Sequence, residues 1–342
     1  MLDERWSEEA AEIGDGLRRM LAQESSIARV RAAEARPDGR DPELEAQLEA
    51  FGLGELPPDP ELAARVAYEL GRAIAPTAFV ESMPALLVLG KAGVAYGFEG
   101  DAPAALARVA VRDHEGVWLQ ELTGPKARSA AGDWLVRPQG VGSRERAGSP
   151  DEADRMWRLM RLVDSARLIG AGQSVLDVGV AYAKERVAGG RVIGSYQAVS
   201  HKLVNAAIAL EGAELLLRKA AYTALPGAGG EGAPTRIFAS FLRAKAVQAA
   251  RLAATTTHQV MGGYGFTLEY DCQLYSRRIR NWSGRLSSPR ADLAEVARTL
   301  LTAEGRDQAR WLWQHERGLD IPDWAKTSDR RAPVTNQIEP AA

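Results

Sequence analysis

The spacing of apolar residues divides the chain into two helical regions with a short alternating region between them. Before residue 90 or so, apolar side chains recur at helical spacing, and breaks occur between Pro57 and Pro60 and again at Pro76. Between Tyr96 and Ser149 the pattern changes to short alternating runs separated by Gly, Asp and Pro. We therefore expect about five N-terminal helices and then a few β-strands.

Helical spacing returns at Asp151 and continues through three stretches of roughly 25 to 37 residues, none with an internal proline. These stretches cover 151–187, 195–225 and the run from Arg236 to about Val260, with a Gly-rich linker, Pro226–Pro234, before the third. Helices of this length favour an antiparallel four-helix bundle. The predicted fold is mainly α with a small β insert, divided into 1–95, 96–150, 151–318 and an extended or disordered tail, 319–342.

Composition excludes several classes of function. A net charge of -2 provides no basic field for nucleic acid, and no run approaches the ~20 apolar residues of a membrane helix. One cysteine, Cys272, and four scattered histidines indicate neither a disulfide nor a metal site. The N-terminus begins acidic and amphipathic, unlike a secretory signal, so we expect a cytoplasmic protein.

Two segments resemble a known family. RVAGGRVIGSYQAVSHKL (186–203) and HQVMGGYGFTLEYDCQLYSRR (258–278) are similar to the C-terminal domain of acyl-CoA dehydrogenases, and FGLGEL (51–56) and VAYELGRAIAPTAFVES (66–82) resemble its N-terminal domain. Two matches in the same order as in the family, flanked by the long helices that the family also has, are far more specific than one glycine cluster. The resemblance implies an N-terminal helical domain, a middle β domain and a C-terminal four-helix bundle. It also implies FAD as cofactor and an acyl-CoA substrate.

The family pattern assigns flavin contacts residue by residue. By resemblance, an arginine and a glutamine reach across a subunit boundary to the flavin dinucleotide of a neighbour, a Gln-x-x-Gly-Gly turn lies against its adenosine side, and a threonine contacts it from below. A guanidinium fork matches a pyrophosphate, and glycine lets backbone approach a ligand closely. The implied residues are Arg186, Gln197, Gln259, Gly262, Gly263 and Thr267.

Simpler interpretations of these positions stay open. Arg186 could pair with Glu185 or Asp271 at a solvated helix end, and the two glycines could be a plain helix C-cap. His258, alone on a long helix, is more typical of a packing or surface residue.

The catalytic base of the family is missing. Desaturation removes an α-proton while hydride leaves the β-carbon, so it requires a carboxylate near the α-carbon. The two positions that hold this glutamate in the family are Met160, beside the shared Arg161, and Leu286. Asp164, one turn after Met160, is a substitute base or a buried structural carboxylate.

Two further departures concern the flavin pocket. Gly189 and Gly190 stand where the family has a Phe-Gly pair, and the β region is about half the usual length, without the strands that enclose the flavin ring. The chain keeps the cross-subunit elements of the flavin site and lacks the base and ring pocket.

The resemblance is therefore greatest to the small, base-lacking subunits of actinobacterial α2β2 acyl-CoA dehydrogenases, which act on steroid side-chain or related CoA esters. The leading hypothesis is a heterotetramer subunit that completes a flavin site in a larger homologous partner. One alternative is a homomeric dehydrogenase with its base relocated to Asp164. The other is a flavin-free scaffold protein.

Overall fold

The computed structural model describes most of the chain from residue 5 to residue 302. The described ranges are 5–96, 102–103, 106–124, 126–129, 134–136, 144–225 and 232–302. The tail expected at 319–342 and residues 226–231 of the predicted linker lie outside the described residues.

The first region is helical, as the apolar spacing predicts. Within the described residues it contains α1 (Glu8–Glu24), α2 (Ile27–Glu34), α3 (Pro42–Ala50), the short 3-10 helix η1 (Leu53–Glu55), α4 (Pro60–Arg72) and α5 (Phe79–Leu89). Helices α3 and α4 both begin with a proline directly after an aspartate. The carboxylates of Asp41 and Asp59 accept the first free backbone N–H groups, as at Leu62 (3.0 Å), and so fix where each helix begins.

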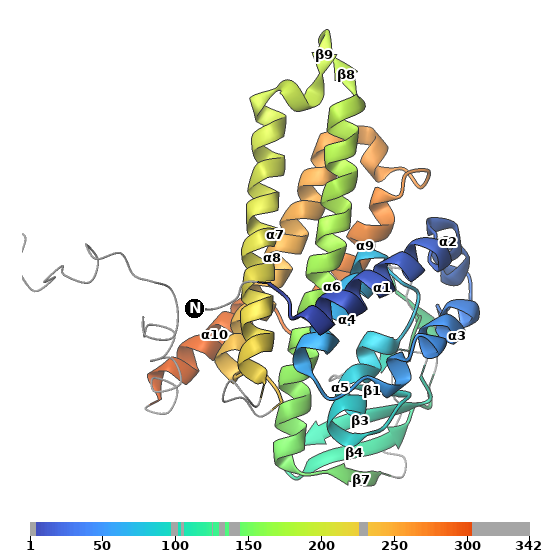
Figure 1. Cartoon of the computed structure of the whole chain (residues 1–342), viewed down its shortest axis with the longest axis vertical. Helices are drawn as coiled ribbons and strands as arrows, with labels where there is room; N and C mark the ends of the chain where they lie inside the picture. Colours follow the sequence, from blue (N-terminus) through green and yellow to red (C-terminus); the bar gives the residue numbers. More distant parts are fainter. Residues whose placement is uncertain are drawn as a thin grey trace, which may run out of the picture.

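The short strands follow and form two small sheets. They are β1 (Val94–Tyr96), β2 (Ala102–Pro103), β3 (Arg108–Asp113), β4 (Gly116–Glu121), β5 (Lys126–Arg128), β6 (Trp134–Val136) and β7 (Glu145–Gly148). One sheet has the order β1-β3-β4-β7 and the other β2-β6-β5; among these described strands, only β1 and β3 pair in parallel. Figure 1 shows the first sheet at the lower end of the molecule, beside α5 and the start of the next helix.

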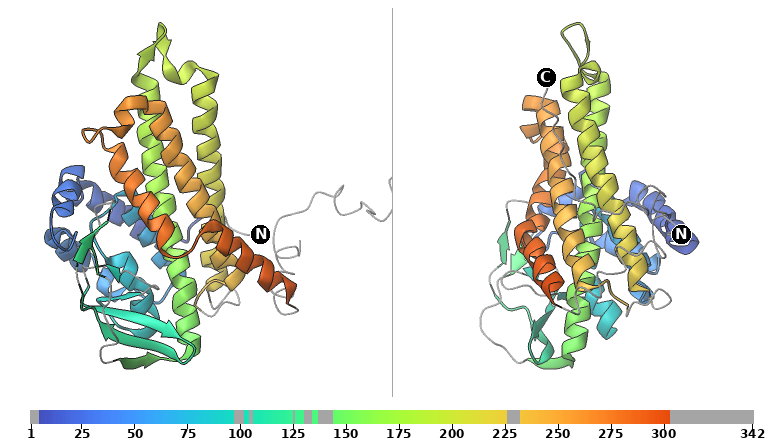
Figure 2. Two further views of the ribbon diagram at one scale, coloured as in Figure 1. Left: turned by 180° about the vertical axis from the view of Figure 1, so that it is seen from behind. Right: turned by 90° about the vertical axis from the view of Figure 1, so that its left-hand side faces the viewer.

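Long helices make up the rest of the described chain. They are α6 (Pro150–Glu185), α7 (Gln197–Ala224), α8 (Arg236–Met261), α9 (Cys272–Arg285) and α10 (Pro289–Leu301), with the hairpin β8 (Val187–Ala188) and β9 (Arg191–Val192) and the 3-10 helices η2 (Ile193–Ser195) and η4 (Gly262–Phe266). The first three match the predicted long helices closely. Figure 2 shows α6, α7 and α8 side by side, with the hairpin projecting at one end.

Helix α6 is the centre of the fold. Ser149 and Glu152 form a capping box at its start, and most side chains from Met156 to Gly172 are buried. It packs against α7, α8 and α9 of the bundle and also against α4 and α5. One continuous core therefore joins the N-terminal helices to the bundle.

In the described ranges, no helix is long and apolar enough to cross a membrane. Within the same ranges, no three His, Cys, Asp or Glu residues gather as a metal site would require.

Candidate functional site

The two positions that hold the catalytic glutamate in the family carry apolar side chains in this fold. Met160 lies on α6 with 1% of its surface exposed, and Leu286 is the half-buried C-cap directly after α9. Leu286 and Arg161 line the same cavity, of about 740 Å³. The structure therefore brings the neighbourhoods of Met160 and Leu286 to one cavity, but neither residue offers a carboxylate to a ligand.

Asp164 is buried inside the bundle between arginines from two helices. Its side chain is 1% exposed; one oxygen accepts a hydrogen bond from Arg167 on α6, and the other lies 2.9 Å from Nη1 of Arg243 on α8. Arg243 also donates to the carbonyl of Trp282, at 2.7 Å. This is the arrangement of a structural ion cluster.

The electrostatics of Asp164 do not suit a general base. Burial raises the pKa of this carboxyl, but Arg167 and Arg243 outweigh burial and hold the pKa below its ordinary value. A base with a depressed pKa is a weak proton acceptor at neutral pH. The charged surroundings of Asp164 therefore give no support to a relocated base at this position.

A second carboxylate extends the same cluster. Glu81 on α5 accepts from Arg167 at 2.6 Å and from Arg285 at 2.8 Å through the same oxygen. The Arg167 guanidinium also lies over the ring of Trp282, 4.3 Å from its centroid. The cluster thus connects α5, α6, α8 and α9 near the end of α9.

The residues matched to the flavin-contacting arginine and glutamine lie at the hairpin end of the bundle. Arg186 is the C-cap directly after α6 and Gln197 begins α7, and both side chains are exposed. Hairpin β8–β9 joins them, and the Arg186 carbonyl accepts the N–H of Ile193 at 2.8 Å. Backbone hydrogen bonds therefore hold the hairpin in place between Arg186 and Gln197.

The Gln-x-x-Gly-Gly segment ends α8. Gly262 is the C-cap, with φ +60° and ψ -133°, a conformation that favours glycine. A Cβ at Gly262 or Gly263 would meet no other atom within 4 Å, so their surroundings are open to a ligand. Gln259 is exposed, and the Thr267 hydroxyl donates to the carbonyl of Tyr264 at 3.1 Å.

Aromatic contacts bring the two helix ends together. The Arg186 guanidinium lies 5.7 Å from the ring centroid of Tyr264, and Tyr182 and Tyr264 are 6.4 Å apart by ring centroids. Asp271, an alternative partner for Arg186, instead pairs with Arg31 at 3.0 Å. Tyr264 was not singled out from the sequence, although the letters GGYGF already place an aromatic residue directly after the glycines.

Large apolar side chains are exposed beside these residues. Phe266 is 75% exposed and Leu268 is 74% exposed, although contact of such large apolar side chains with water is unfavourable. His258 packs against Phe266 with ring centroids 4.9 Å apart, as expected for a packing residue. The end of the bundle thus combines exposed apolar groups, an exposed guanidinium and open glycine backbone, which fits a contact with another chain and an anionic ligand.

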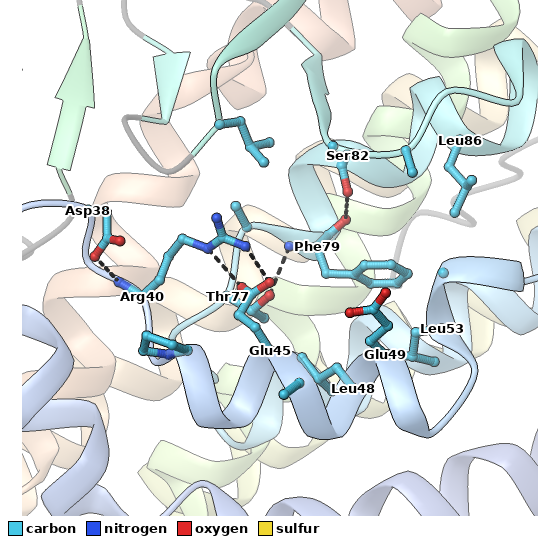
Figure 3. Close-up of a pocket in the computed structure, with 17 residues that line it drawn as sticks. Asp38, Arg40, Glu45, Leu48, Glu49, Leu53, Thr77, Phe79, Ser82 and Leu86 are labelled. Atoms are coloured by element: carbon cyan, nitrogen blue, oxygen red, sulfur yellow. Dashed lines mark hydrogen bonds and ion pairs between the residues drawn. The ribbon is translucent and has the colours of Figure 1, made fainter.

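The described residues also line two further cavities. One, of about 620 Å³, lies between α8 and α9 and is lined by Arg251, His258, Phe266 and Arg277, among others. The other, of about 540 Å³, lies between α3 and α5 (Figure 3). Its apolar wall includes Leu53 from FGLGEL and Phe79 from VAYELGRAIAPTAFVES, so it joins the two N-terminal segments that resemble the family.

Comparisons with known proteins agree with these observations. The sequence profile of the acyl-CoA dehydrogenase C-terminal domain matches residues 154–283. The acyl-CoA dehydrogenase IpdE2 of Mycobacterium tuberculosis is 30% identical over 312 residues, which cover 82% of this chain and 92% of that protein.

Solved structures share the fold at low sequence identity. The steroid ACAD variant Tcur3481-Tcur3483 is similar at a TM-score of 0.77 and 19% identity, covering 87% of this chain and 100% of that chain. The ChsE4-ChsE5 complex from Mycobacterium tuberculosis is similar at a TM-score of 0.73 and 20% identity, covering 87% and 99%. The chain is a member of the acyl-CoA dehydrogenase family.

Proposed function

We propose that this chain is the base-lacking subunit of a heteromeric, FAD-dependent acyl-CoA dehydrogenase. A homologous larger subunit supplies the glutamate and the flavin-ring pocket, and this chain completes the flavin site with its bundle end. One contrast carries the proposal. Five of the six positions that match the family's flavin contacts are exposed and Thr267 is half-buried, whereas both base positions, Met160 and Leu286, are apolar.

The bundle end is chemically suited to the dinucleotide part of FAD. Arg186 has an exposed guanidinium, and such a group donates two parallel hydrogen bonds to a pyrophosphate. Tyr264 supports that guanidinium from the neighbouring helix end. The open backbone at Gly262 and Gly263 allows close approach of the adenosine side, and exposed Gln197 and Gln259 add polar contacts.

The reaction requires groups that this chain does not provide at its base positions. When bound, FAD accepts the hydride that leaves the β-carbon of the acyl group. Removal of the α-proton requires a carboxylate within hydrogen-bonding reach, and a thioether or a branched alkyl group accepts no proton. Because Asp164 is fixed between two arginines, we assign the base to the partner.

The similar proteins support a heteromeric assembly and a bulky substrate. One similar fold belongs to the ChsE4-ChsE5 complex and another to a steroid ACAD, Tcur3481-Tcur3483. By analogy we propose an α2β2 complex and a steroid side-chain or related CoA ester as the substrate.

Co-expression with a homologous, glutamate-containing dehydrogenase tests the assembly. We expect the chain alone to be colourless or insoluble and the co-expressed pair to purify as a yellow complex with acyl-CoA dehydrogenase activity. A yellow, active homomer would overturn the proposal. A stable complex without flavin absorbance would instead indicate the flavin-free scaffold.

Matched variants test the flavin contact within that complex. Arg186→Gln should weaken retention of FAD about tenfold or more, because it removes a charge-assisted contact. Arg191→Gln is the control, since Arg191 is exposed on the same hairpin and its guanidinium lies 3.9 Å from the ring centroid of Tyr196. Equal retention of FAD in both variants would contradict the role of Arg186.

A further inference from the structure

The cavity between α8 and α9 has cations in its lining and no anion to balance them. It measures about 620 Å³, and no aspartate or glutamate is among the described residues that line it. Three arginines and a histidine contribute instead. The polar lining includes Arg251, Thr255 and His258 from α8 and Ser276, Arg277 and Arg280 from α9. A concave surface with charges of one sign favours an occupant of the opposite sign.

Two of these arginines are without a counter-charge. Arg251 and Arg280 are both exposed, and in the part of the chain that the structure describes neither forms an ion pair. Arg277 differs, because it pairs with Glu34 on α2 at 3.0 Å. Glu34 also pairs with Arg278, at 2.8 Å, so its single charge is shared between these two guanidiniums. Even after Glu34 is counted, the positive charges of Arg251 and Arg280 are uncompensated among the described residues.

The histidine of the lining adds no further charge at neutral pH. Burial, and then the nearby Arg280, lower the pKa of His258 below its ordinary value. The ring is therefore neutral, and it packs against Phe266 with centroids 4.9 Å apart. Attraction for an anion thus depends on Arg251 and Arg280, which stand on two different helices along the cavity.

Exposed apolar groups at the edge of the cavity favour a protein segment over a small anion as the occupant. Phe266 lines the cavity and is 75% exposed, and Leu268, two residues later, is 74% exposed. An inorganic anion would leave both side chains in water. Contacts between protein chains, in contrast, commonly combine aromatic side chains with arginine.

The cavity is also continuous with the proposed flavin contacts. His258 directly precedes Gln259, and Phe266 is the last residue of η4, which begins at Gly262. A partner that covers Gln259 and Gly262 to complete the flavin site would therefore also reach the cavity.

We propose that this cavity is the docking site for an acidic segment of the larger subunit, with one carboxylate on Arg251 and another on Arg280. Guanidinium–carboxylate pairs are charge-assisted and directional, so two of them would fix how the segment is seated. An apolar side chain of the same segment covers Phe266. This inference rests on the proposed function, because its occupant is the partner that completes the flavin site.

Charge reversal in the co-expressed complex tests the docking site. We expect Arg251→Glu and Arg280→Glu each to raise the dissociation constant of the two subunits about tenfold or more, because each variant places a carboxylate against an acidic segment. Sedimentation of the complex over a dilution series measures that constant. Added salt should weaken assembly of the wild type more than assembly of either variant. Arg251→Lys keeps the charge and should retain most of the affinity.

Arg19→Glu is the matched control. Arg19 is exposed on α1 and does not line the cavity, so its reversal changes net charge equally and should leave assembly unchanged. Thermal melting confirms that the variants are folded, as expected for exposed positions. Equal weakening by Arg19→Glu and the two cavity variants would overturn the docking site.

The flavin absorbance of the same complexes separates this inference from the proposed function. Complexes of Arg251→Glu and Arg280→Glu that stay assembled should retain FAD. Loss of FAD without any change in assembly would overturn the docking site and assign the two arginines to the cofactor. Wild-type subunits that do not assemble would overturn the proposed function and this inference together, whereas a yellow wild-type complex insensitive to both reversals would overturn this inference alone.

Discussion

Asp164 shows how one buried carboxylate organises several cations. It contacts Arg167 from its own helix and Arg243 from α8, and both arginines are almost fully buried. A buried guanidinium without a counter-charge is very unfavourable, so the carboxylate is needed wherever both arginines are retained. The role of Asp164 in the fold is thus to neutralise charge inside the bundle.

Replacing this carboxylate should strongly destabilise the protein. We expect Asp164→Asn to lower the free energy of unfolding by about 3–5 kcal/mol, because it leaves buried arginine charge uncompensated. Urea denaturation followed by circular dichroism measures the change. Asp177→Asn, on the exposed face of the same helix, breaks a 3.3 Å pair with Arg72 and should cost less than ~1 kcal/mol. Similar losses in the two variants would contradict this account.

Cys272 is the one cysteine of the chain, and its chemistry is set by burial. It is fully buried at the start of α9, and burial raises the pKa of its thiol to about 12. Because the thiolate is the reactive form, the native protein at pH 8 should react very slowly with iodoacetamide. The same protein in denaturant should be alkylated fully, which mass spectrometry measures. Rapid alkylation of the native chain would show that the start of α9 opens readily.

At the scale of elements, the long helices were predictable and the shorter ones less so. The periodicity of 151–187, 195–225 and the run from Arg236 reproduces α6, α7 and α8 to within two residues at either end. In helices of this length, a few residues that do not fit the apolar spacing leave the overall helical period clear. Helix α9 was not predicted as a separate element, because three of its seven buried residues, Gln273, Arg278 and Ser283, are polar and interrupt the apolar spacing.

The end of α8 was recognised from its glycines, and its backbone explains why one of them is required. Gly262 has φ +60°, whereas Gly263 is not among the glycines with positive φ. Gly262→Ala should therefore cost about 1–3 kcal/mol of stability through backbone strain. Gly263→Ala should stay within about 1 kcal/mol of the wild type, since its surroundings are open. Thermal melting of both variants measures this difference, and equal melting temperatures would argue against strain at the cap.

At the scale of the whole molecule, the sequence located the residues that we propose to contact flavin, but not the side-chain contacts that hold them in place. The motif letters placed Arg186 and Gly262 on two helix ends, and a shared bundle brings those ends together. The stacking of Arg186 on Tyr264 and the enclosure of Asp164 by Arg243 depend on contacts between distant helices. Such contacts have no local signal in a single sequence.

Glycine residues on both helices lie at the contact between α4 and the bundle helix α6. Where α4 crosses α6, a Cβ at Gly170 would lie 2.1 Å from the carbonyl oxygen of Tyr68, and one at Gly71 would lie 2.1 Å from that of Arg167. These distances are far below van der Waals contact, and both obstacles are backbone atoms. The two helices can therefore pack this closely only because neither residue has a side chain.

Gly170→Ala should consequently separate the two helices and destabilise the whole chain. We expect a loss of about 2 kcal/mol or more, since a backbone carbonyl cannot rotate away as a side chain can. Gly212→Ala is the control, because Gly212 is an exposed residue within α7 with open space around it. That change should raise stability by about 0.5–1 kcal/mol by restricting the unfolded chain. Urea denaturation distinguishes these opposite signs, and a Gly170→Ala variant as stable as Gly212→Ala would show that the helices do not pack as closely as described.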